Sequence, residues 1–361
     1  MVYNYTPCHA AIYQSSTWSL KMVLSDHMLD TDIKNIDFQL CERPGPFWSA
    51  FRERGYLLEE ARIEAKPIIR MVSPEGNIWM TSTNVSYPMV SGLVEEIAVN
   101  KFLAYEIVKS AGFRIPETEL LTHLQTTSES KLLETVNPVI VKPGDSFGSK
   151  GVTLDISDTQ QLADAVTIAR QLSKDVIIQE QVSGEEIRFT IIKGRVASVL
   201  LRQSPRVIGD GQSTVAQLIE KENYERTLLD FQYISYPQLT DRLIDGHFFQ
   251  DSSILKDGNV LQLSKATMIK QGASIFDIID EVDTTYKVIA EKIAYALGAT
   301  FITVDMFVED YSTPSGDDNY WFNECNTSPA LRLYYGDKNK KGPTTAKAII
   351  NQMDYIIRTG L

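Results

Sequence analysis

Cysteine and histidine are scarce in this chain. Its 361 residues include three cysteines (Cys8, Cys41 and Cys325) and four histidines, without CxxC or HxxxH spacing. An odd, scattered set of cysteines is not typical of a disulfide scaffold and indicates a reducing compartment, so we expect a cytoplasmic protein. The same scarcity argues against a zinc site and against chemistry that depends on histidine.

Long apolar runs and an excess of basic residues are also missing. No run reaches the ~18 apolar residues of a membrane span, and the N-terminus lacks the pattern of a secretory signal. The 47 acidic and 35 basic residues give a net charge of −12, which repels nucleic acid overall but leaves room for a local basic pocket. With 43% hydrophobic residues, the chain is long enough for two or three folded lobes.

The chain does contain hairpins mixed with helices. Hydrophobic spacing predicts helices at 47–55, 91–112, 158–173, 213–222 and 284–298. Strands are expected at 138–143, 175–182, 301–308 and 320–326, with hairpins around 73–76 and around Lys193-Gly194. No repeat of 20–50 residues is visible. This order favours an α+β protein with several lobes over a regular alternation of strands and helices.

A glycine-rich stretch, GDSFGSKG at 144–151, follows the strand that carries Lys142. Glycine allows backbone N–H groups to approach phosphate oxygens closely. The stretch matches neither the Walker A pattern nor GxGxxG, and on its own it is more often a surface loop. Lys142 stands in an apolar strand with a proline at each end, so it is either a snorkelling edge residue or a placed cation.

Asp305, Glu324 and Asn326 form a second candidate site. Glu324 and Asn326 are two apart on a predicted strand and share a face, and the strand of Asp305 is the natural antiparallel neighbour. Carboxylate and amide oxygens suit Mg²⁺ bound to a polyphosphate. The alternative is a solvated sheet face with unrelated polar residues. Cys325, between the two, is expected to face away and pack in the core.

The segment 179–189 is a third candidate with weaker signal. A strand that breaks at Ser183-Gly184 can expose backbone groups to an adenine edge, and Glu186 could accept from ribose hydroxyls, although a charged turn fits equally well. Arg188 and Arg202 share a sheet face if the following hairpin is tight. Spacing alone suits them to solvent as well as to phosphate.

In combination, these motifs resemble the ATP-grasp carboxylate–amine ligases, and among them the branch of cyanophycin synthetase and the glutathione-synthetase module of bifunctional glutathione enzymes. The resemblance runs from about Ser91 to Ile350. It rests on VIVKPGDSFGSKGV, on NECNTSPALRLYYG and above all on R-x-x-G-D-G-x-x-T-x-x-x-L-I-x-x-E-N at 206–223. It implies an α+β ATP-grasp fold with the nucleotide between two α+β lobes, preceded by a small N-terminal α/β substrate lobe. The implied boundaries are 1–92, 93–182 and 183–361.

The resemblance also implies roles for individual residues. The implied nucleotide-binding residues are Lys101, Lys142, Ser146, Gly148, Gly151, Glu180, Gln181, Val182 and Glu186. Among these, 180–182 would form the adenine hinge, Glu186 would contact the ribose, and 144–151 would be a mobile loop over the phosphates. Asp305, Glu324 and Asn326 would hold two Mg²⁺ ions, with Mn²⁺ as a substitute. Arg188, Arg202 and Lys142 would serve catalysis, and Arg332 and Ser328 would bind substrate.

The implied activity is an ATP-dependent, ADP-forming ligation that joins a carboxylate to an amine through an acyl phosphate. Amino acids or short peptides are the expected substrates, with γ-glutamylcysteine plus glycine as the leading pair. A phosphotransferase of the same fold is the alternative. Neither nucleic acid nor a membrane is expected as a partner, and a homodimer or higher homo-oligomer stays open. The segment LSKATMIKQGAS at 263–274 departs from the branch at Ser264, Met268 and Ala273, which leaves the joined substrates open.

Overall fold

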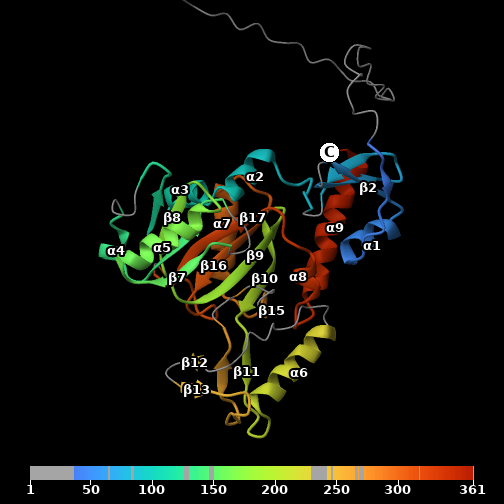
Figure 1. The fold of residues 1–361 in the computed structure, drawn as a ribbon. Helices are drawn as coiled ribbons and strands as arrows, with labels where there is room; N and C mark the ends of the chain where they lie inside the picture. The colour runs from blue at the N-terminus through green and yellow to red at the C-terminus, as the bar shows by residue number, and fades with distance from the viewer. Residues whose placement is uncertain are drawn as a thin grey trace, which may run out of the picture.

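A five-stranded antiparallel sheet, the central sheet, organises the computed structural model (Figure 1). The model describes residues 36–63, 66–82, 85–125, 130–145, 150–228, 242–244, 247–264, 267, 272–316 and 318–360, with the backbone alone for 242–244 and 247–249. In spatial order the strands are β15 (Ser274–Asp277), β10 (Arg195–Gln203), β9 (Glu185–Ile192), β16 (Phe301–Val308) and β17 (Tyr320–Asn326). All four pairings are antiparallel. The predicted hairpin around Lys193-Gly194 and the two predicted C-terminal strands are therefore confirmed.

The two faces of the central sheet differ in chemistry because side chains alternate along each strand. One face contributes Ile187, Phe189 and Ile191 to an apolar core beneath α3 (Lys101–Ser110) and α7 (Thr284–Ala296). On the opposite face the alternate positions of β9 are Glu186, Arg188 and Thr190, all buried. Buried charges of this kind need partners, so this face is where a functional site is expected.

A second antiparallel sheet, the lateral sheet, stands beside the central one. Its strands in order are β5 (Thr118–Leu121), β8 (Val176–Glu180), β6 (Val139–Pro143) and β7 (Thr153–Ile156). Its core packs against α5 (Thr159–Arg170), with α4 (Leu132–Thr135) near its end. The predicted strands at 138–143 and 175–182 and the helix at 158–173 are confirmed.

The N-terminal sheet shares its core with the C-terminal helix. The strands β1 (Gln39–Leu40), β2 (Leu57–Ile63), β3 (Lys66–Val72) and β4 (Ile78–Thr81) form it in that order, with α1 (Pro46–Glu53) beside them. Leu58, Ile69 and Met71 from this sheet are buried in one cluster with Ile349 and Met353 of α9 (Gly342–Thr359). Figure 1 shows the two ends of the described chain side by side. The predicted division at 92 and 182 stays a prediction.

A small lobe projects from the far end of the central sheet (Figure 1). It contains β11 (Arg206–Ile208), α6 (Val215–Leu228), β12 (Arg242–Ile244), β13 (His247–Phe249) and β14 (Val260–Gln262). Arg226 of α6 is fully buried and donates to the backbone carbonyls of Gly272 (2.8 Å) and Ala273 (2.9 Å). The segment R-x-x-G-D-G and its following helix therefore build this lobe and tie it to the start of β15.

The prediction of one continuous helix at 91–112 is wrong. Residues 91–112 form two helices, α2 (Gly92–Val99) and α3, because Asn100 between them has extended backbone (φ −88°, ψ 92°). The Asn100 side chain accepts a hydrogen bond from Leu103 N (3.1 Å) and so caps α3. This break places Lys101 in the first turn of α3.

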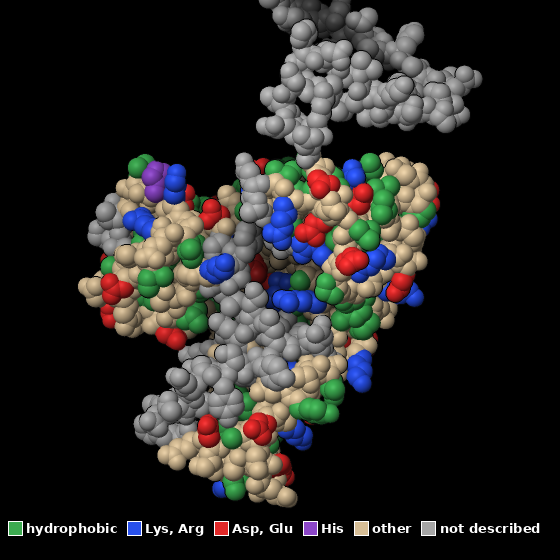
Figure 2. Space-filling view, turned by 45° about the vertical axis from the view of Figure 1, so that its right-hand side comes forward, with side chains coloured by type: hydrophobic (Ala, Val, Ile, Leu, Met, Phe, Trp, Pro, Cys, Tyr) green, Lys and Arg blue, Asp and Glu red, His purple; other side chains and the backbone are tan. Residues whose placement is uncertain are grey.

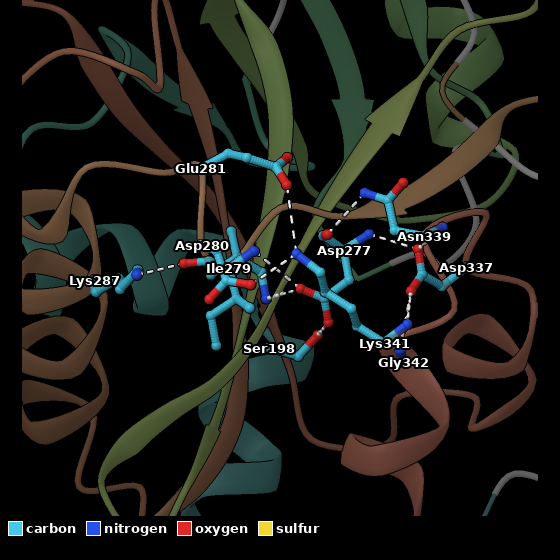
Figure 3. A network of polar contacts seen from close by, with 11 residues as sticks. Ser198, Asp277, Ile279, Asp280, Glu281, Lys287, Asp337, Asn339, Lys341 and Gly342 are labelled. Atoms are coloured by element: carbon cyan, nitrogen blue, oxygen red, sulfur yellow. Dashed lines mark hydrogen bonds and ion pairs between the residues drawn. The ribbon is translucent and has the colours of Figure 1, made fainter.

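A buried polar network fastens the chain before α9 to the central sheet (Figure 3). Asp337, 1% exposed, accepts hydrogen bonds from the backbone N–H groups of Asp277 (2.6 Å), Asn339 (2.9 Å), Lys341 (2.7 Å) and Gly342 (2.9 Å). The Asp277 carboxylate in turn accepts from Ser198 Oγ (2.7 Å) on β10. Asp337 thus accepts from three backbone N–H groups at and just before the start of α9 and from a fourth at the end of β15.

Helices alternate irregularly with strands along the chain, and the strands form antiparallel sheets, as expected for an α+β protein. Among the described residues, no helix is long and apolar enough to cross a membrane.

Candidate functional site

An ion pair between Arg188 and Asp305 lies at the centre of the charged sheet face. The register of β9, β16 and β17 places Arg188 opposite Asp305 and Asp305 opposite Glu324. Arg188 Nε lies 2.7 Å from Asp305 Oδ1, and Nη2 lies 2.6 Å from Oδ2. Both side chains are buried, at 5% and 0% exposure. The expectation that the strands of Asp305 and Glu324 are antiparallel neighbours is confirmed.

The electrostatics of this pair keep both groups charged. Burial alone would lower the pKa of Arg188, but Asp305 and Glu324 outweigh it and raise the pKa above its usual value. Burial alone would raise the pKa of Asp305, yet the guanidinium groups of Arg188 and Arg202 hold it below its ordinary value. Arg202 Nη2 lies 3.5 Å from Asp305 Oδ2. The site therefore presents fixed charges to any ligand.

Glu186 and Arg202 extend this charged cluster. They pair across β9 and β10, with Arg202 Nη1 2.6 Å from Glu186 Oε1. Thr267 donates to the other carboxylate oxygen, and burial raises the pKa of Glu186 despite Arg202. Both oxygens of Glu186 thus accept hydrogen bonds within the chain. Its ribose role, and the catalytic roles of Arg188 and Arg202, stay predictions.

Lys142 reaches the same region from the lateral sheet. Its side chain is buried, and Nζ donates to Tyr105 Oη (2.6 Å) and Gln179 Oε1 (2.8 Å). Burial lowers the pKa of Lys142 to about 8, although the carboxylates of Glu324 and Glu186 oppose the shift. Lys142 is therefore an internal cation and not a snorkelling edge residue.

The lowered pKa of Lys142 predicts a pH-dependent stability difference. The unfolded state, with a pKa of 10.5, binds more protons than the folded state above pH 8, so the penalty of the buried charge is full below pH 8 and fades toward pH 10.5. Between pH 7 and pH 9 the wild type should gain about 1 kcal/mol of unfolding free energy relative to Lys142→Met. Urea unfolding of both proteins at the two pH values measures this. A gap that does not change with pH would contradict a depressed pKa.

Lys101 lies close to the glycine-rich stretch. Its backbone N donates to Gly144 O (3.3 Å), which joins the start of α3 to the end of β6. Burial lowers the pKa of Lys101, opposed by Glu324. Of the predicted loop 144–151, Gly151 is described, whereas Ser146 and Gly148 lie outside the described residues. Gly151 has φ +73°, and a Cβ there would lie 2.8 Å from Leu172 Cδ1, so the position favours glycine.

The predicted adenine hinge lies at the end of β8. Glu180 Oε2 accepts from Glu117 N (3.1 Å), and the Gln181 side chain exchanges hydrogen bonds with Asp155 at 2.7 and 2.8 Å. Val182 follows, half-buried. Gly184 then turns the chain from β8 into β9, with φ +130°. The three hinge residues connect the lateral and central sheets, and their contact with adenine stays a prediction.

Gly184→Ala should destabilise the protein by roughly 2 kcal/mol or more, because a Cβ there would lie 2.7 Å from Val308 O. Gly194→Ala is the matched control, since Gly194 also has positive φ (+73°) but no atom within 4 Å of its Cβ position. The unfolding free energy of the control should fall by only ~1 kcal/mol, the cost of backbone strain at a positive φ. Denaturant unfolding compares them, and equal losses would show that the contact with Val308 is unimportant.

The oxygen ligands proposed from the sequence differ in their surroundings. Glu324 is 34% exposed on its side chain and lies 3.8 Å from Arg188 Nη2. Asn326 Oδ1 accepts from Ser328 N (2.7 Å), and both Asp305 oxygens accept from Arg188. Among the described residues, no group of three or more His, Cys, Asp or Glu side chains is arranged to hold a metal ion. Glu324 and Asn326 carry the oxygen donors that Mg²⁺ prefers, whereas Asp305 is engaged by Arg188, so the three-residue ligand set stays a prediction.

The substrate-side residues follow β17. Ser328 is half-buried, and Arg332 is exposed at the start of α8 (Arg332–Tyr335). Tyr87 from the N-terminal part donates to Pro329 O (3.0 Å) and so fixes the loop between Ser328 and Arg332. Figure 2 shows a hollow near the middle of one face, with Lys and Arg side chains gathered around it. An anionic ligand would find complementary charge there.

Four contributors were missed in the sequence: the buried Tyr105, Gln179 and Tyr87 and the half-buried Thr267. A signal existed for Gln179, a polar residue within the apolar run of β8. No local pattern singles out the two tyrosines, because their hydroxyl partners come from segments more than 200 residues away. In the divergent segment, Ser264 is half-buried and Ala273 fully buried, while Met268 lies outside the described residues.

Comparison with known proteins agrees with the motifs. Residues 98–228 match a family model described as ATP-grasp domain. The chain is 24% identical over 263 residues to cyanophycin synthetase from Nostoc sp., covering 72% of this chain and 29% of the relative. It is 24% identical over 268 residues to the glutathione biosynthesis bifunctional protein GshAB from Clostridium perfringens, covering 71% and 34%. The chain thus spans about a third of the length of these curated relatives.

A solved structure is similar in fold. The crystal structure of a bifunctional glutathione synthetase from Pasteurella multocida matches with a TM-score of 0.60 and 21% identity, covering 85% of this chain and 43% of that chain. The predicted fold class is confirmed by this match and by the mixed helices and antiparallel sheets. The chain therefore has the ATP-grasp fold of this neighbour, residues 98–228 match the ATP-grasp domain model, and the chain is similar to cyanophycin synthetases and bifunctional glutathione enzymes, the branch that its motifs resemble.

Proposed function

We propose that this protein is an ATP-dependent, ADP-forming carboxylate–amine ligase that makes a peptide or isopeptide bond. Its substrates are amino acids or short peptides, and γ-glutamylcysteine plus glycine is the leading pair, in keeping with the names of the relatives. A reducing cytoplasm is the proposed location, and it suits Cys41 and Cys325, which among the described residues are free and buried.

One observation carries the proposal. The buried cation of the lateral sheet, Lys142, lies next to the strand that bears the partly exposed carboxylate Glu324. Lys142 Nζ contacts Tyr105 Oη, and Tyr105 Oη donates to Asn323 O (2.6 Å), the residue before Glu324. The fold therefore brings a buried cation and a partly exposed carboxylate close together, which supports phosphate binding by Lys142 and metal binding by Glu324.

The residues present fit magnesium as the companion of ATP. Glu324 and Asn326 would hold Mg²⁺, with Asp305 as the third proposed ligand, and the ion when bound would neutralise phosphate charge. Lys142 and Lys101 would bind the polyphosphate. Arg188 and Arg202 present fixed positive charge beside Asp305, suited to the negative charge that develops during phosphoryl transfer.

The chemistry needs no histidine. A substrate carboxylate oxygen attacks the γ-phosphorus of ATP, the bond to the β-phosphate oxygen breaks, and ADP leaves. The nitrogen of an amine then attacks the acyl carbon, phosphate leaves with the bonding electrons, and the amine loses a proton. Arg332, exposed after the proposed metal strand, would bind a carboxylate of the substrate.

The decisive experiment measures ADP release and product mass with pairs of amino acids and dipeptides. The ligase proposal expects ADP, phosphate and a new amide in equal amounts, with the amide absent when the amine is omitted. ADP formation without any amine that leaves a stable phosphorylated substrate would replace the ligase with the phosphotransferase of the same fold.

A further inference from the structure

Tyr105 is a fully buried residue of α3 that links the two sheets. Its Oη accepts a hydrogen bond from Lys142 Nζ (2.6 Å) and donates one to Asn323 O (2.6 Å). Burial raises the pKa of Tyr105 well above its usual value, so the hydroxyl keeps the proton that it donates. Because Lys142 belongs to β6 and Asn323 to β17, this hydroxyl connects the lateral sheet with the central sheet.

Gln179 holds Lys142 from the other side. Its Oε1 accepts from Lys142 Nζ (2.8 Å), and its Nε2 donates to Thr118 Oγ1 (2.7 Å). Thr118 Oγ1 donates its own proton to Pro116 O (2.7 Å), so the Thr118 oxygen can only accept from Gln179. The orientation of the Gln179 amide is thereby fixed, with its oxygen toward the ammonium.

The geometry of an ammonium group makes these two contacts directional. Lys142 has three N–H donors in tetrahedral arrangement, and Tyr105 and Gln179 accept from two of them. Within the described ranges no third acceptor contacts Nζ, so the remaining N–H has one fixed direction. The charged groups that act on Lys142 are the carboxylates of Glu324 and Glu186, and the ammonium of Lys101 lies near enough to be coupled to it.

We propose that Tyr105 and Gln179 are positioning residues that aim the Lys142 ammonium at the nucleotide phosphates, and that Tyr105 fixes this aim relative to strand β17. The inference rests on the proposed ATP-binding role of Lys142. Neither residue touches the nucleotide in this proposal, and both act through Lys142.

Tyr105→Phe tests the inference. It removes one acceptor from the ammonium, so ATP affinity at pH 7 should fall roughly tenfold, the size of one hydrogen bond to a charged group. With one acceptor fewer, the Lys142 charge is also less favoured, and the pH above which ATP binding weakens should move below its wild-type value. Direct ATP titration between pH 6 and pH 9 measures both effects without relying on turnover.

A double-mutant cycle separates positioning from general loosening. In the Lys142→Met background, Tyr105→Phe should have no further effect on ATP affinity, because it acts through the lysine. Tyr286→Phe is the matched control, since Tyr286 is equally buried and donates to a backbone carbonyl, Asp310 O (3.3 Å), away from the site. The control should bind ATP as the wild type does.

Two results would overturn the inference: unchanged affinity and pH profile in Tyr105→Phe, or additive effects in the cycle. If Tyr105→Phe fails to fold, Gln179→Met decides, since it removes the other acceptor and should weaken ATP binding similarly, whereas wild-type affinity would refute the positioning role. Wild-type protein that binds no ATP would instead refute the proposed function.

Discussion

Glu324→Ala should lower ligase turnover roughly a thousandfold or more, because it removes the partly exposed carboxylate that we propose for Mg²⁺ beside the transferring phosphate. The stability of the fold should change little. The side chain is about one-third exposed, and its contact with Arg188 is long at 3.8 Å, so the unfolding free energy should change by less than ~1 kcal/mol. ADP release at saturating substrates and urea unfolding measure the two quantities.

Two further variants of acidic residues sharpen this result. Glu324→Gln keeps the shape but loses the charge, so it should need more Mg²⁺ for half-maximal activity. Glu309→Ala removes an exposed carboxylate just beyond β16 and should keep wild-type turnover. Full activity of Glu324→Ala, with the wild-type Mg²⁺ requirement, would rule out the metal role.

Asp337→Ala should cost the largest amount of stability, about 3 kcal/mol or more. Its carboxylate accepts from four backbone N–H groups at 2.6 to 2.9 Å, and the substitution would leave two buried and two partly buried N–H groups without this acceptor. Asp337→Asn keeps one acceptor oxygen and should fall between the wild type and the alanine variant. Denaturant unfolding at pH 7 measures the losses.

Asp280→Ala provides the control in the same network. Asp280 is 77% exposed and pairs with Lys341 Nζ at 2.8 Å, so solvent takes over its role and the melting temperature should not change (Figure 3). If Asp337→Ala also had the melting temperature of the wild type, the network would not contribute to the stability of the fold.

Local sequence patterns predicted the strands of the central sheet and the sheet face that Asp305 and Glu324 share. They did not predict the contacts of the buried charged side chains on that face. Alternation along β16 and β17 placed Asp305 and Glu324 together, since hairpin neighbours share a register. The break at Asn100 was missed because the helical periodicity of 91–112 continues across it, and one extended residue leaves the apolar pattern almost intact.

The partners of the buried charges could not be predicted in the same way. Arg188 looked equally suited to solvent, because its carboxylate partner lies 117 residues further along the chain. The Tyr105 contact with Asn323 spans 218 residues, and no local pattern records it. Tertiary pairing decides whether such side chains are solvated or internal. A single sequence, taken without an alignment to its relatives, contains little of that information.

The shared core of the N-terminal sheet and α9 has a consequence for biosynthesis. Helix α9 begins at residue 342, whereas β4 ends at residue 81, so the ribosome completes the sheet long before it makes the helix. At ~5–20 residues per second, the apolar side of the nascent sheet stays uncovered for about 10–50 seconds. During translation this part of the protein therefore exposes apolar surface, and its core is completed only after α9 has emerged.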